Sequence, residues 1–596
     1  MFNPKRLCKG TISATLKRRY LLLCLLLGFS FLELGAADFP FPYGIASGDA
    51  DESSVVLWTR LDNAISLPHW VSWEVATDEA FSSIVISGSG MQNRQTVKVL
   101  VEGLSAGWYY YRFSAAGYTS APGRTFIADS ETEEITFAAF SCADYQRGYF
   151  TAYEAALEQN DFQFLLFLGD YYYDNAPSES AVDVEDRSHL PPYAPRTADD
   201  FERRWKQYRS DPMLQRLHQN YGSYAIWDDH EFADDCWRDG GDGVEGEEWE
   251  QLKEAAIAAW YEWMPVRSRT LHYDARRIGP VNLILTETRV TGRDIVMDAD
   301  DPGISEEDRS MLGSGQESWL AENLNQQIPW NVLCSGVVMM PQLYDGLSIR
   351  PHAWDGYPAA RARLELEIEN AEVALCVLSG DMHAARVADL PREDYDPGNQ
   401  SGSWGIEVTA PPVTSIVRTV PDSLSFRDQN PHIRYLQEQN RGFVKVQFTP
   451  MDMTAQFVWV TDVLDEEATT GIPGEIYTSM IGSNAVVLAT TTPFIANPVS
   501  IISEETSSFN KKDISSTVFP NPSTGIITLS ATLVPGEYAL NVFSSDGRLL
   551  YSEHYTAVYR GLRYIVLDLG SLIPGNYLLC MEGQEFSVVE SIILSE

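Results

Sequence analysis

Three short apolar runs in the middle of the chain each end in an aspartate with a second polar side chain close by. Residues 164–168 precede Gly169-Asp170 and Tyr173, residues 225–227 precede Asp228-Asp229-His230, and residues 377–379 precede Gly380-Asp381-Met382-His383. Such runs predict strands buried on both faces, and layered α/β folds bind ligands at the carboxyl ends of their strands. We therefore expect three strands to deliver Asp, Tyr and His side chains to one edge of one sheet.

The hydrophobic pattern on either side of these runs predicts three folded regions. Short β-like segments separated by turns fill the stretch from Phe39 to about Ile127 and predict a small antiparallel sandwich. From about Glu134 to Thr490, apolar strands such as 281–285 alternate with helical stretches such as 251–263, a pattern typical of a layered α/β domain. After a polar linker, a β-rich unit runs to the C-terminus and predicts a second sandwich.

The first 37 residues differ in composition from the rest of the chain. Several lysines and arginines precede an apolar run from Tyr20 to about Leu32, and small residues follow at Gly35-Ala36-Ala37. An apolar stretch of about 13 residues is short for a bilayer span but fits the core of a signal peptide. An N-terminal membrane anchor is the alternative. We expect an exported mature chain with no transmembrane segment.

Composition narrows the classes of function. The 596 residues are 44% hydrophobic and 12% aromatic, which indicates a folded chain of several domains. The 84 acidic residues far outnumber the 43 Lys and Arg, so a surface that binds nucleic acid is disfavoured. An anionic substrate requires local cations, metals included, to overcome the overall negative field.

Cysteine usage does not indicate a disulfide scaffold, although one bridge remains open. Beyond the signal segment the chain has five cysteines: Cys142, Cys236, Cys334, Cys376 and Cys580. Cys334 and Cys376 lie inside apolar runs and are expected to be core thiols. Cys142 follows the apolar run 135–141 and marks a fourth strand end, where it is either an iron or zinc ligand or an ordinary buried thiol.

The residue types at the strand ends point to metal chemistry. Asp170 and Tyr173 can place a carboxylate and a phenolate on one cation, and tyrosinate favours a hard metal such as Fe³⁺. The four ionisable groups from Asp228 to Glu231 repel one another unless cations are present. Asp234 and Asp235 can add oxygen ligands for Ca²⁺ or Mg²⁺. The alternatives are an aromatic packing edge at Tyr173, a solvated acidic turn for Asp228 or Glu231, and a structural role for His383.

Together these segments resemble the PhoD-like alkaline phosphatases of the metallophosphoesterase superfamily. The likeness begins with Phe41–Asp49 and Val55–Arg60, and it covers nearly all of residues 39–490. The other similar segments are Ser141-Cys142, Gly169–Tyr173, Trp227–His230, Leu312-Gly313 with Gln316 and Trp319-Leu320, Trp354–Tyr357, Ser379–His383, Asn430–His432 and Arg441–Phe443.

The resemblance implies a role for each strand-end residue. Cys142, Asp170, Tyr173, Asp381 and His383 match the family's Fe³⁺ ligands, with Asp170 bridging to Ca²⁺. Asp229 matches the ligand of the second metal, and His230 is the catalytic residue that faces the substrate. One or two Ca²⁺ ions are expected. The family usually has Asn near Asp235, and here Asp234-Asp235 stands instead. The extra charge should tighten Ca²⁺ binding at Asp235 and repel phosphate.

The expected activity is metal-dependent hydrolysis of phosphate esters by attack of a metal-bound hydroxide, with His230 protonating the leaving alkoxide or holding the phosphate. Substrates are phosphate-ester small molecules or polymers. The nearest alternative is the same fold acting on diesters, such as phospholipids. An alternative of another class is a non-catalytic, Ca²⁺-binding adhesion protein on the cell surface.

The C-terminal unit resembles the sorting domains of type IX secretion cargo. The residues that carry this likeness are Phe519–Gly525, Asp546-Gly547, Asp568-Leu569 and Gly575–Tyr577. The alternative is a carbohydrate-binding or adhesive sandwich. The predicted organisation is a signal peptide at 1–37, an N-terminal β-sandwich at 38–128, a layered αββα metallophosphoesterase domain at 129–490, a linker at 491–513 and a C-terminal sorting β-sandwich at 514–596. The secretion machinery is the partner of the last domain.

Overall fold

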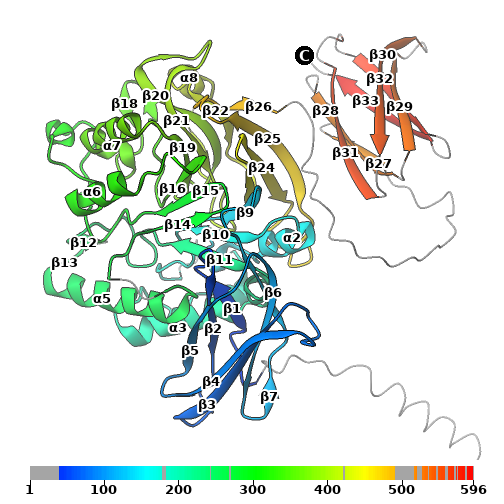
Figure 1. Ribbon diagram of the computed structural model, residues 1–596. Helices are drawn as coiled ribbons and strands as arrows, with labels where there is room; N and C mark the ends of the chain where they lie inside the picture. The colour runs from blue at the N-terminus through cyan, green and yellow to red at the C-terminus, as the bar shows by residue number, and fades with distance from the viewer. Residues whose placement is uncertain are drawn as a thin grey trace, which may run out of the picture. The chain divides into compact units, whose positions relative to one another are not determined.

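The computed structural model divides the chain into two units at Val487/Leu488, and each unit is described by itself (Figure 1). In the first unit it describes residues 39–177, 183–241, 243–267, 270–420 and 423–487. In the second it describes residues 488–489, 516–519, 526–533, 536–544, 548–557, 561–569, 572, 575–583 and 587–594. The expected signal peptide and linker lie outside the described residues. No helix among those described is long and apolar enough to cross a membrane.

A ten-stranded sheet runs through the first unit and carries two of the three aspartate-terminated strands. Its strands are, in spatial order, β26 (Val487–Leu488), β25 (Ile472–Met480), β24 (Asp452–Val460), β23 (Arg441–Phe448), β9 (Ile135–Phe140), β10 (Phe164–Leu168), β11 (Gly222–Ile226), β1 (Ile45–Gly48), β2 (Ser54–Arg60) and β5 (Thr96–Glu102). Strands β9, β10 and β11 are parallel neighbours, so their carboxyl ends meet at one edge.

The third aspartate-terminated strand belongs to a separate, seven-stranded sheet. Its order is β14 (Asp274–Ile278), β15 (Val281–Leu285), β16 (Trp330–Ser335), β19 (Ala374–Ser379), β21 (Ser401–Thr409), β20 (Ala385–Asp396) and β22 (Ile433–Gln437). The expectation that the three strands share one sheet is therefore wrong. A short apolar run predicts a buried strand but does not say which sheet the strand joins.

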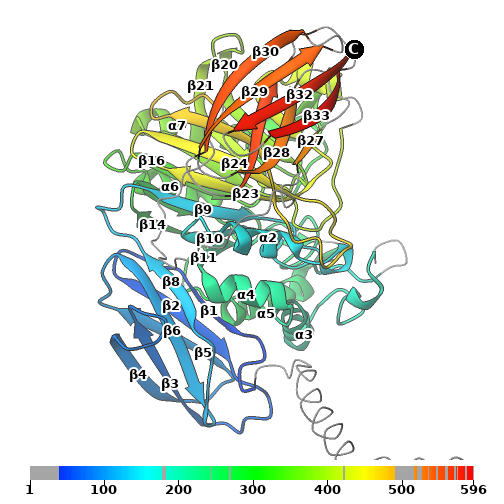
Figure 2. The same cartoon turned by 90° about the vertical axis from the view of Figure 1, so that its right-hand side faces the viewer.

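The two sheets enclose the largest hydrophobic core between them. Leu166 of β10 and Tyr224 of β11 lie in the same buried cluster as Leu283 of β15 and Leu378 of β19. Helices cover the outer face of each sheet, as Figures 1 and 2 show. On the ten-stranded sheet they are α2 (Thr151–Gln159), α3 (Ala198–Arg209), α4 (Pro212–Asn220) and α5 (Gly246–Trp263); on the other sheet they are α6 (Gly313–Asn323) and α7 (Pro358–Ala371).

The local sequence explains where these helices begin. Thr197 caps α3 with its hydroxyl and forms a capping box with Asp200, and Asp211 caps α4 ahead of Pro212 at the first helical position. The predicted helix at 251–263 lies within α5, and the one expected near Ser314 is α6. A short helix, α8 (Ser423–Gln429), lies near the small hairpin of β17 (Leu343–Tyr344) and β18 (Leu347–Ser348).

The N-terminal β segments form two packed layers, one of which is continuous with the central sheet. Strands β1, β2 and β5 extend the ten-stranded sheet through the parallel pairing of β1 with β11. The remaining strands form a five-stranded sheet that packs on β2 and β5 through the shared core (Figure 2). They are β3 (His69–Ala76), β4 (Ile84–Gln92), β6 (Gly107–Ala115), β7 (Tyr118–Thr119) and β8 (Gly123–Ile127). The alternation of apolar residues identified the strands but not their partners.

The second unit is built from β-strands. A three-stranded sheet contains β27 (Ser516–Phe519), β28 (Ile526–Leu533) and β31 (Gly561–Asp568), and a four-stranded sheet contains β30 (Leu549–Ala557), β29 (Gly536–Ser544), β32 (Gly575–Gly583) and β33 (Ser587–Leu594). Leu540, Leu579 and Ile592 are fully buried in its core. The predicted strands at 538–543, 564–567 and 577–579 lie in β29, β31 and β32. Residues 520–525 of the Phe519–Gly525 motif lie outside the described residues.

Candidate active site

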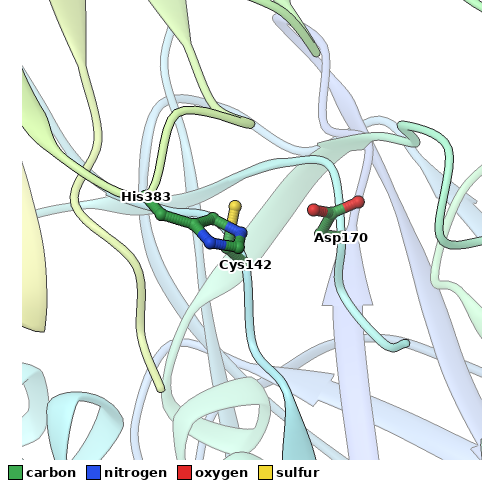
Figure 3. Close-up of side chains that lie close together, drawn as sticks. All are labelled: Cys142, Asp170 and His383. Atoms are coloured by element: carbon green, nitrogen blue, oxygen red, sulfur yellow. The ribbon is translucent and has the colours of Figure 1, made fainter. Parts of the chain in front are cut away.

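Side chains from the ends of both sheets converge on one buried cluster. Ligand atoms of Cys142, Asp170 and His383 lie within 4.8 Å of one another, and all three residues are buried (Figure 3). Cys142 follows β9, Asp170 follows β10 and His383 follows β19. Cys142 is thus not an isolated core thiol, whereas Cys334 and Cys376 are confirmed as core thiols. Among the described residues, Cys142, Cys236, Cys334 and Cys376 are buried and outside any disulfide.

The backbone turns sharply at each of these residues. The φ angles are 59° at Cys142, 52° at Asp170, 61° at Asp381 and 54° at His383, all in the left-handed region. Residues with a Cβ atom adopt this region at a cost of about 1–3 kcal/mol each, and such strain concentrates at functional sites. The backbone at these strand ends is therefore strained, and the strained turns direct the side chains toward one point.

Tyr173 joins the same cluster. Its hydroxyl donates to Oδ2 of Asp170 at 3.1 Å and lies 2.8 Å from Nε2 of His383. Two buried atoms of the cluster, Oδ1 of Asp170 and Nδ1 of His383, have no hydrogen-bond partner among the described residues. Unpaired buried polar atoms are costly, and sulfur, imidazole, phenol and carboxylate together fit a transition-metal ion. The donor set therefore suits a metal.

The cluster is electrostatically crowded. Burial, and next the charge of Asp170, raise the pKa of the Cys142 thiol well above its usual range, and the same two causes raise the pKa of Tyr173. Burial raises the pKa of Asp170 in the same way, supported by Asp229 and opposed by His230. Without a cation these groups favour their protonated forms, whereas a metal favours the anionic forms that bind it.

A second set of oxygen ligands adjoins the first and shares Asp170 with it. Asp170, Asp229 and His230 form one group with ligand atoms within 4.8 Å of one another, and Asp229, Asp234 and Asp235 form another. Oδ2 of Asp229 accepts from the backbone N–H of Asp235 at 2.8 Å, which fixes the turn between them. The structure thus brings six of the seven predicted metal ligands and His230 to one continuous cluster.

Asp381, the seventh predicted ligand, makes different contacts. Its Oδ2 atom accepts from Nη2 of Arg350 at 3.1 Å, and its Oδ1 atom lies 4.0 Å from Nη2 of Arg289. The negative charge of Asp381 is therefore balanced by two arginines. Neither arginine stands out in the sequence pattern.

His230 has a partner that the sequence reasoning did not identify. Its Nδ1 atom lies 2.8 Å from Oδ1 of Asp174, whose side chain is only 3% exposed. Although burial lowers the pKa of His230, the carboxylates of Asp170, Asp229 and Asp174 raise it well above the usual range. The position of Asp174 directly after the Gly169–Tyr173 motif was the available signal for it.

Asp228 and Glu231 do not form a solvated acidic turn, because both are buried. Glu231 accepts backbone N–H groups from Tyr171 at 2.6 Å, Asp228 at 2.8 Å and Asp170 at 3.2 Å, so it ties the ends of β10 and β11 together. The carboxylate of Asp228 accepts hydrogen bonds from Nε and Nη2 of Arg289 at 2.6 and 2.8 Å. Both residues therefore support the site through contacts inside the protein.

Hydrogen bonds hold the loop after β15, which carries Arg289, in a fixed conformation. The Glu287 carboxylate accepts the backbone N–H groups of Arg289 and Val290 at 2.7 and 2.8 Å, and the indole of Trp227 at 3.0 Å. The amide of Gln316 clamps the backbone of Glu287 with bonds of 2.9 and 2.8 Å. The resemblance included Gln316 without a role, and its role is to hold this loop.

Three regions of the chain match known family models. Residues 137–457 match the family model of the PhoD-like phosphatases, and residues 32–129 match the N-terminal domain of the same family. The chain belongs to the PhoD-like phosphatase family. Residues 517–595 match the secretion system C-terminal sorting domain.

Two relatives place the chain within the family. Alkaline phosphatase D of Bacillus subtilis (strain 168) is 32% identical over 463 residues, which cover 71% of this chain and 78% of the relative. A solved structure described as "Structure of PhoD" is 27% identical with a TM-score of 0.70, over 77% of this chain and 94% of that one. This PhoD-like chain is a phosphoric ester hydrolase, and its sorting domain indicates export by type IX secretion to the cell surface or beyond.

Proposed function

We propose that the chain is a metal-dependent phosphoesterase of the alkaline phosphatase D type that removes phosphate from esters outside the cell. The observation that carries the proposal is the cluster of Cys142, Asp170 and His383, whose ligand atoms lie within 4.8 Å of one another. Adhesion requires no such buried set of thiol, carboxylate and imidazole. The cluster therefore favours catalysis over the adhesion alternative.

The two halves of the cluster suit different ions. Cys142, Tyr173 and His383 offer sulfur, phenolate and nitrogen and would hold Fe³⁺ together with Asp170 and Asp381. Asp229 and Asp235 offer oxygen and would hold one or two Ca²⁺ ions, with Asp170 between the metals. Bound cations of this kind withdraw charge from phosphate oxygens and make water more acidic.

His230 is the proposed proton donor to the leaving oxygen. Asp174 holds its Nδ1 atom at 2.8 Å, so the ring is fixed in one orientation and Nε2 is left for the substrate. The surrounding carboxylates favour the protonated ring that a general acid needs. The hydroxyl of Ser141 lies 2.9 Å from the Cys142 sulfur rather than beside a histidine. We therefore favour direct attack by water over a phosphoserine intermediate.

The proposed organisation keeps the boundaries expected from the sequence. A signal peptide at 1–37 precedes an N-terminal domain at 38–128, a layered αββα catalytic domain at 129–490, a linker at 491–513 and a sorting domain at 514–596. Buried clusters on the outer face of each central sheet support the layered description. The partners are small or polymeric phosphate esters and the secretion machinery, and the acidic balance of the chain argues against nucleic acid.

The test compares hydrolysis of 4-nitrophenyl phosphate and bis(4-nitrophenyl) phosphate by the full chain, with and without a metal chelator. We expect faster turnover of the monoester and loss of both activities with chelator. Equal or faster turnover of the diester would overturn the monoesterase preference. Activity that survives exhaustive chelation would overturn the metal dependence. Asp170→Asn serves as the matched inactive variant, because it removes the charge of the shared carboxylate and keeps its shape.

A further inference from the structure

A phosphate ester has to approach an edge of the protein that is rich in carboxylates. Asp170, Asp174, Asp229, Asp235 and Asp381 all lie in or beside the cluster. The whole chain carries a formal net charge of −41. This field repels a dianion and weakens its binding unless bound metal ions and positive side chains at the site oppose it. A positive side chain that binds the phosphate must not already be paired with a carboxylate of the protein.

Most cations at this edge are already engaged. Arg289 is fully buried and its guanidinium is held on Asp228 at 2.6 and 2.8 Å. Arg350 is mostly buried and donates to Asp381 at 3.1 Å. His352 lies 3.0 Å from Oδ1 of Asp235. Each of these groups is engaged by a carboxylate of the protein itself and is not available to a ligand without breaking that contact.

The loop from Ala410 to Arg418 is hydrogen-bonded to two residues of the cluster. The backbone N–H of Ser415 donates to the carbonyl of Cys142 at 3.2 Å, and its hydroxyl donates to the same carbonyl at 2.8 Å. Further along, the backbone N–H of Arg418 donates to the carbonyl of His383 at 3.3 Å. One loop is thus fixed to a residue after β9 and to a residue after β19, and Arg418 is the residue through which it is fixed to His383.

Arg418 differs from the other cations at this edge. The residue is exposed, and its guanidinium makes no hydrogen bond or ion pair with any residue that the structure describes. Although burial opposes the shift, the charges of Asp381, Tyr173 and Cys142 raise the pKa of Arg418. A free cation whose backbone is anchored at the site is positioned to meet an incoming anion.

We propose that Arg418 binds the phosphate group of the substrate, as the cation through which a dianionic monoester is recognised at this site. The proposal rests on the phosphoesterase function proposed above and adds a binding residue to it. A guanidinium offers two parallel N–H donors to phosphate oxygens, and such charge-assisted pairs are among the stronger hydrogen bonds in proteins. A monoester carries more negative charge than a diester, so Arg418 favours monoesters.

The test uses Arg418→Gln and Arg418→Lys in the full, metal-loaded chain. For Arg418→Gln we expect the KM for 4-nitrophenyl phosphate and the inhibition constant of inorganic phosphate to rise together by about 10- to 100-fold, the size of a lost charge-assisted bond. The change in kcat should be much smaller, and the KM for bis(4-nitrophenyl) phosphate should rise less. Arg418→Lys should weaken phosphate binding less than Arg418→Gln does, because lysine keeps the positive charge but lacks the two parallel N–H donors.

Arg203→Gln is the matched control, because Arg203 is an exposed arginine on α3. It should leave both constants unchanged. Calorimetric binding of inorganic phosphate to the wild type and to Arg418→Gln gives a readout that needs no turnover. Equal phosphate affinity in the two proteins would overturn the role of Arg418 and leave the phosphoesterase function intact. Failure of the wild type to hydrolyse any ester would overturn the phosphoesterase function, while the binding comparison would still decide the role of Arg418.

Discussion

The Nδ1 atom of His230 lies 2.8 Å from Oδ1 of Asp174, which joins the loops that follow β11 and β10. The imidazole ring also lies against the ring of Tyr173, with 4.0 Å between the ring centroids. His230 is therefore held by an acceptor at one ring nitrogen and by an aromatic face. Its remaining nitrogen, Nε2, is 3.8 Å from the largely exposed Asp234.

Asp174→Asn should lower kcat without unfolding the protein. The amide keeps the shape of the carboxylate but no longer stabilises the protonated imidazole, so we expect a loss of about 10- to 1,000-fold, below the full contribution of a general acid. Turnover of a series of aryl and alkyl phosphates checks the mechanism, because the loss should grow as the leaving group becomes more basic. An equal loss for all leaving groups would show that Asp174 does not act through proton donation.

Arg289→Met should strongly destabilise the protein. The substitution leaves the buried carboxylate of Asp228 without its partner, which typically costs about 3–5 kcal/mol of unfolding free energy. Urea unfolding measures the loss, and Asp228→Asn combined with Arg289→Met should recover part of it. Arg216→Met is the control, because Arg216 forms an exposed pair with Glu154 and its loss should cost less than about 1 kcal/mol. Similar losses for both arginines would contradict the prediction.

Glu407 should make stability depend on pH. Burial raises its pKa from 4.5 to about 7, against hydrogen bonds from Ser379, Met339 and Met340 that lower it. The folded protein therefore holds a proton that the unfolded chain has released. This stabilising contribution is complete below about pH 4.5 and is lost as the pH rises through 7, a change of about 3 kcal/mol at about 1.4 kcal/mol per pKa unit.

The check is urea unfolding of the wild type and Glu407→Gln from pH 4 to pH 8. Glutamine cannot ionise, so the difference between the two unfolding free energies should shift in favour of the variant as the pH rises. A difference that stays constant across this range would show that Glu407 ionises in the folded protein as it does in the unfolded chain.

Removal of residues 488–596 should separate export from catalysis. The first unit ends at Val487 and contains every residue of the proposed site, whereas the sorting-domain match begins at residue 517. We expect the shortened chain to keep the kcat and KM of the full chain and to stay inside the cell envelope. Cell fractionation and activity assays check both parts. Normal export of the shortened chain would contradict the assigned role of the C-terminal unit.

The sequence predicted the strand ends better than the arrangement around them. Asp170, Asp229 and His383 could be found because each follows a short apolar run. The membership of β19 in a second sheet could not be predicted, because strand pairing depends on contacts between segments far apart in the chain. Arg289 and Arg418 were missed for a related reason. They lie on loops, and only the folded chain shows that one is enclosed by carboxylates and the other is free.

Metal analysis of the native full-length chain decides whether the buried cluster is a metal centre. We expect about one transition-metal ion per chain, with iron as the first candidate, together with calcium. Cys142→Ser should lose the transition metal and the phosphatase activity together, and Cys376→Ser, a change in a core thiol away from the cluster, should keep both. Native protein that contains calcium but no transition metal, with Asp170→Asn as active as the wild type, would contradict the proposed site.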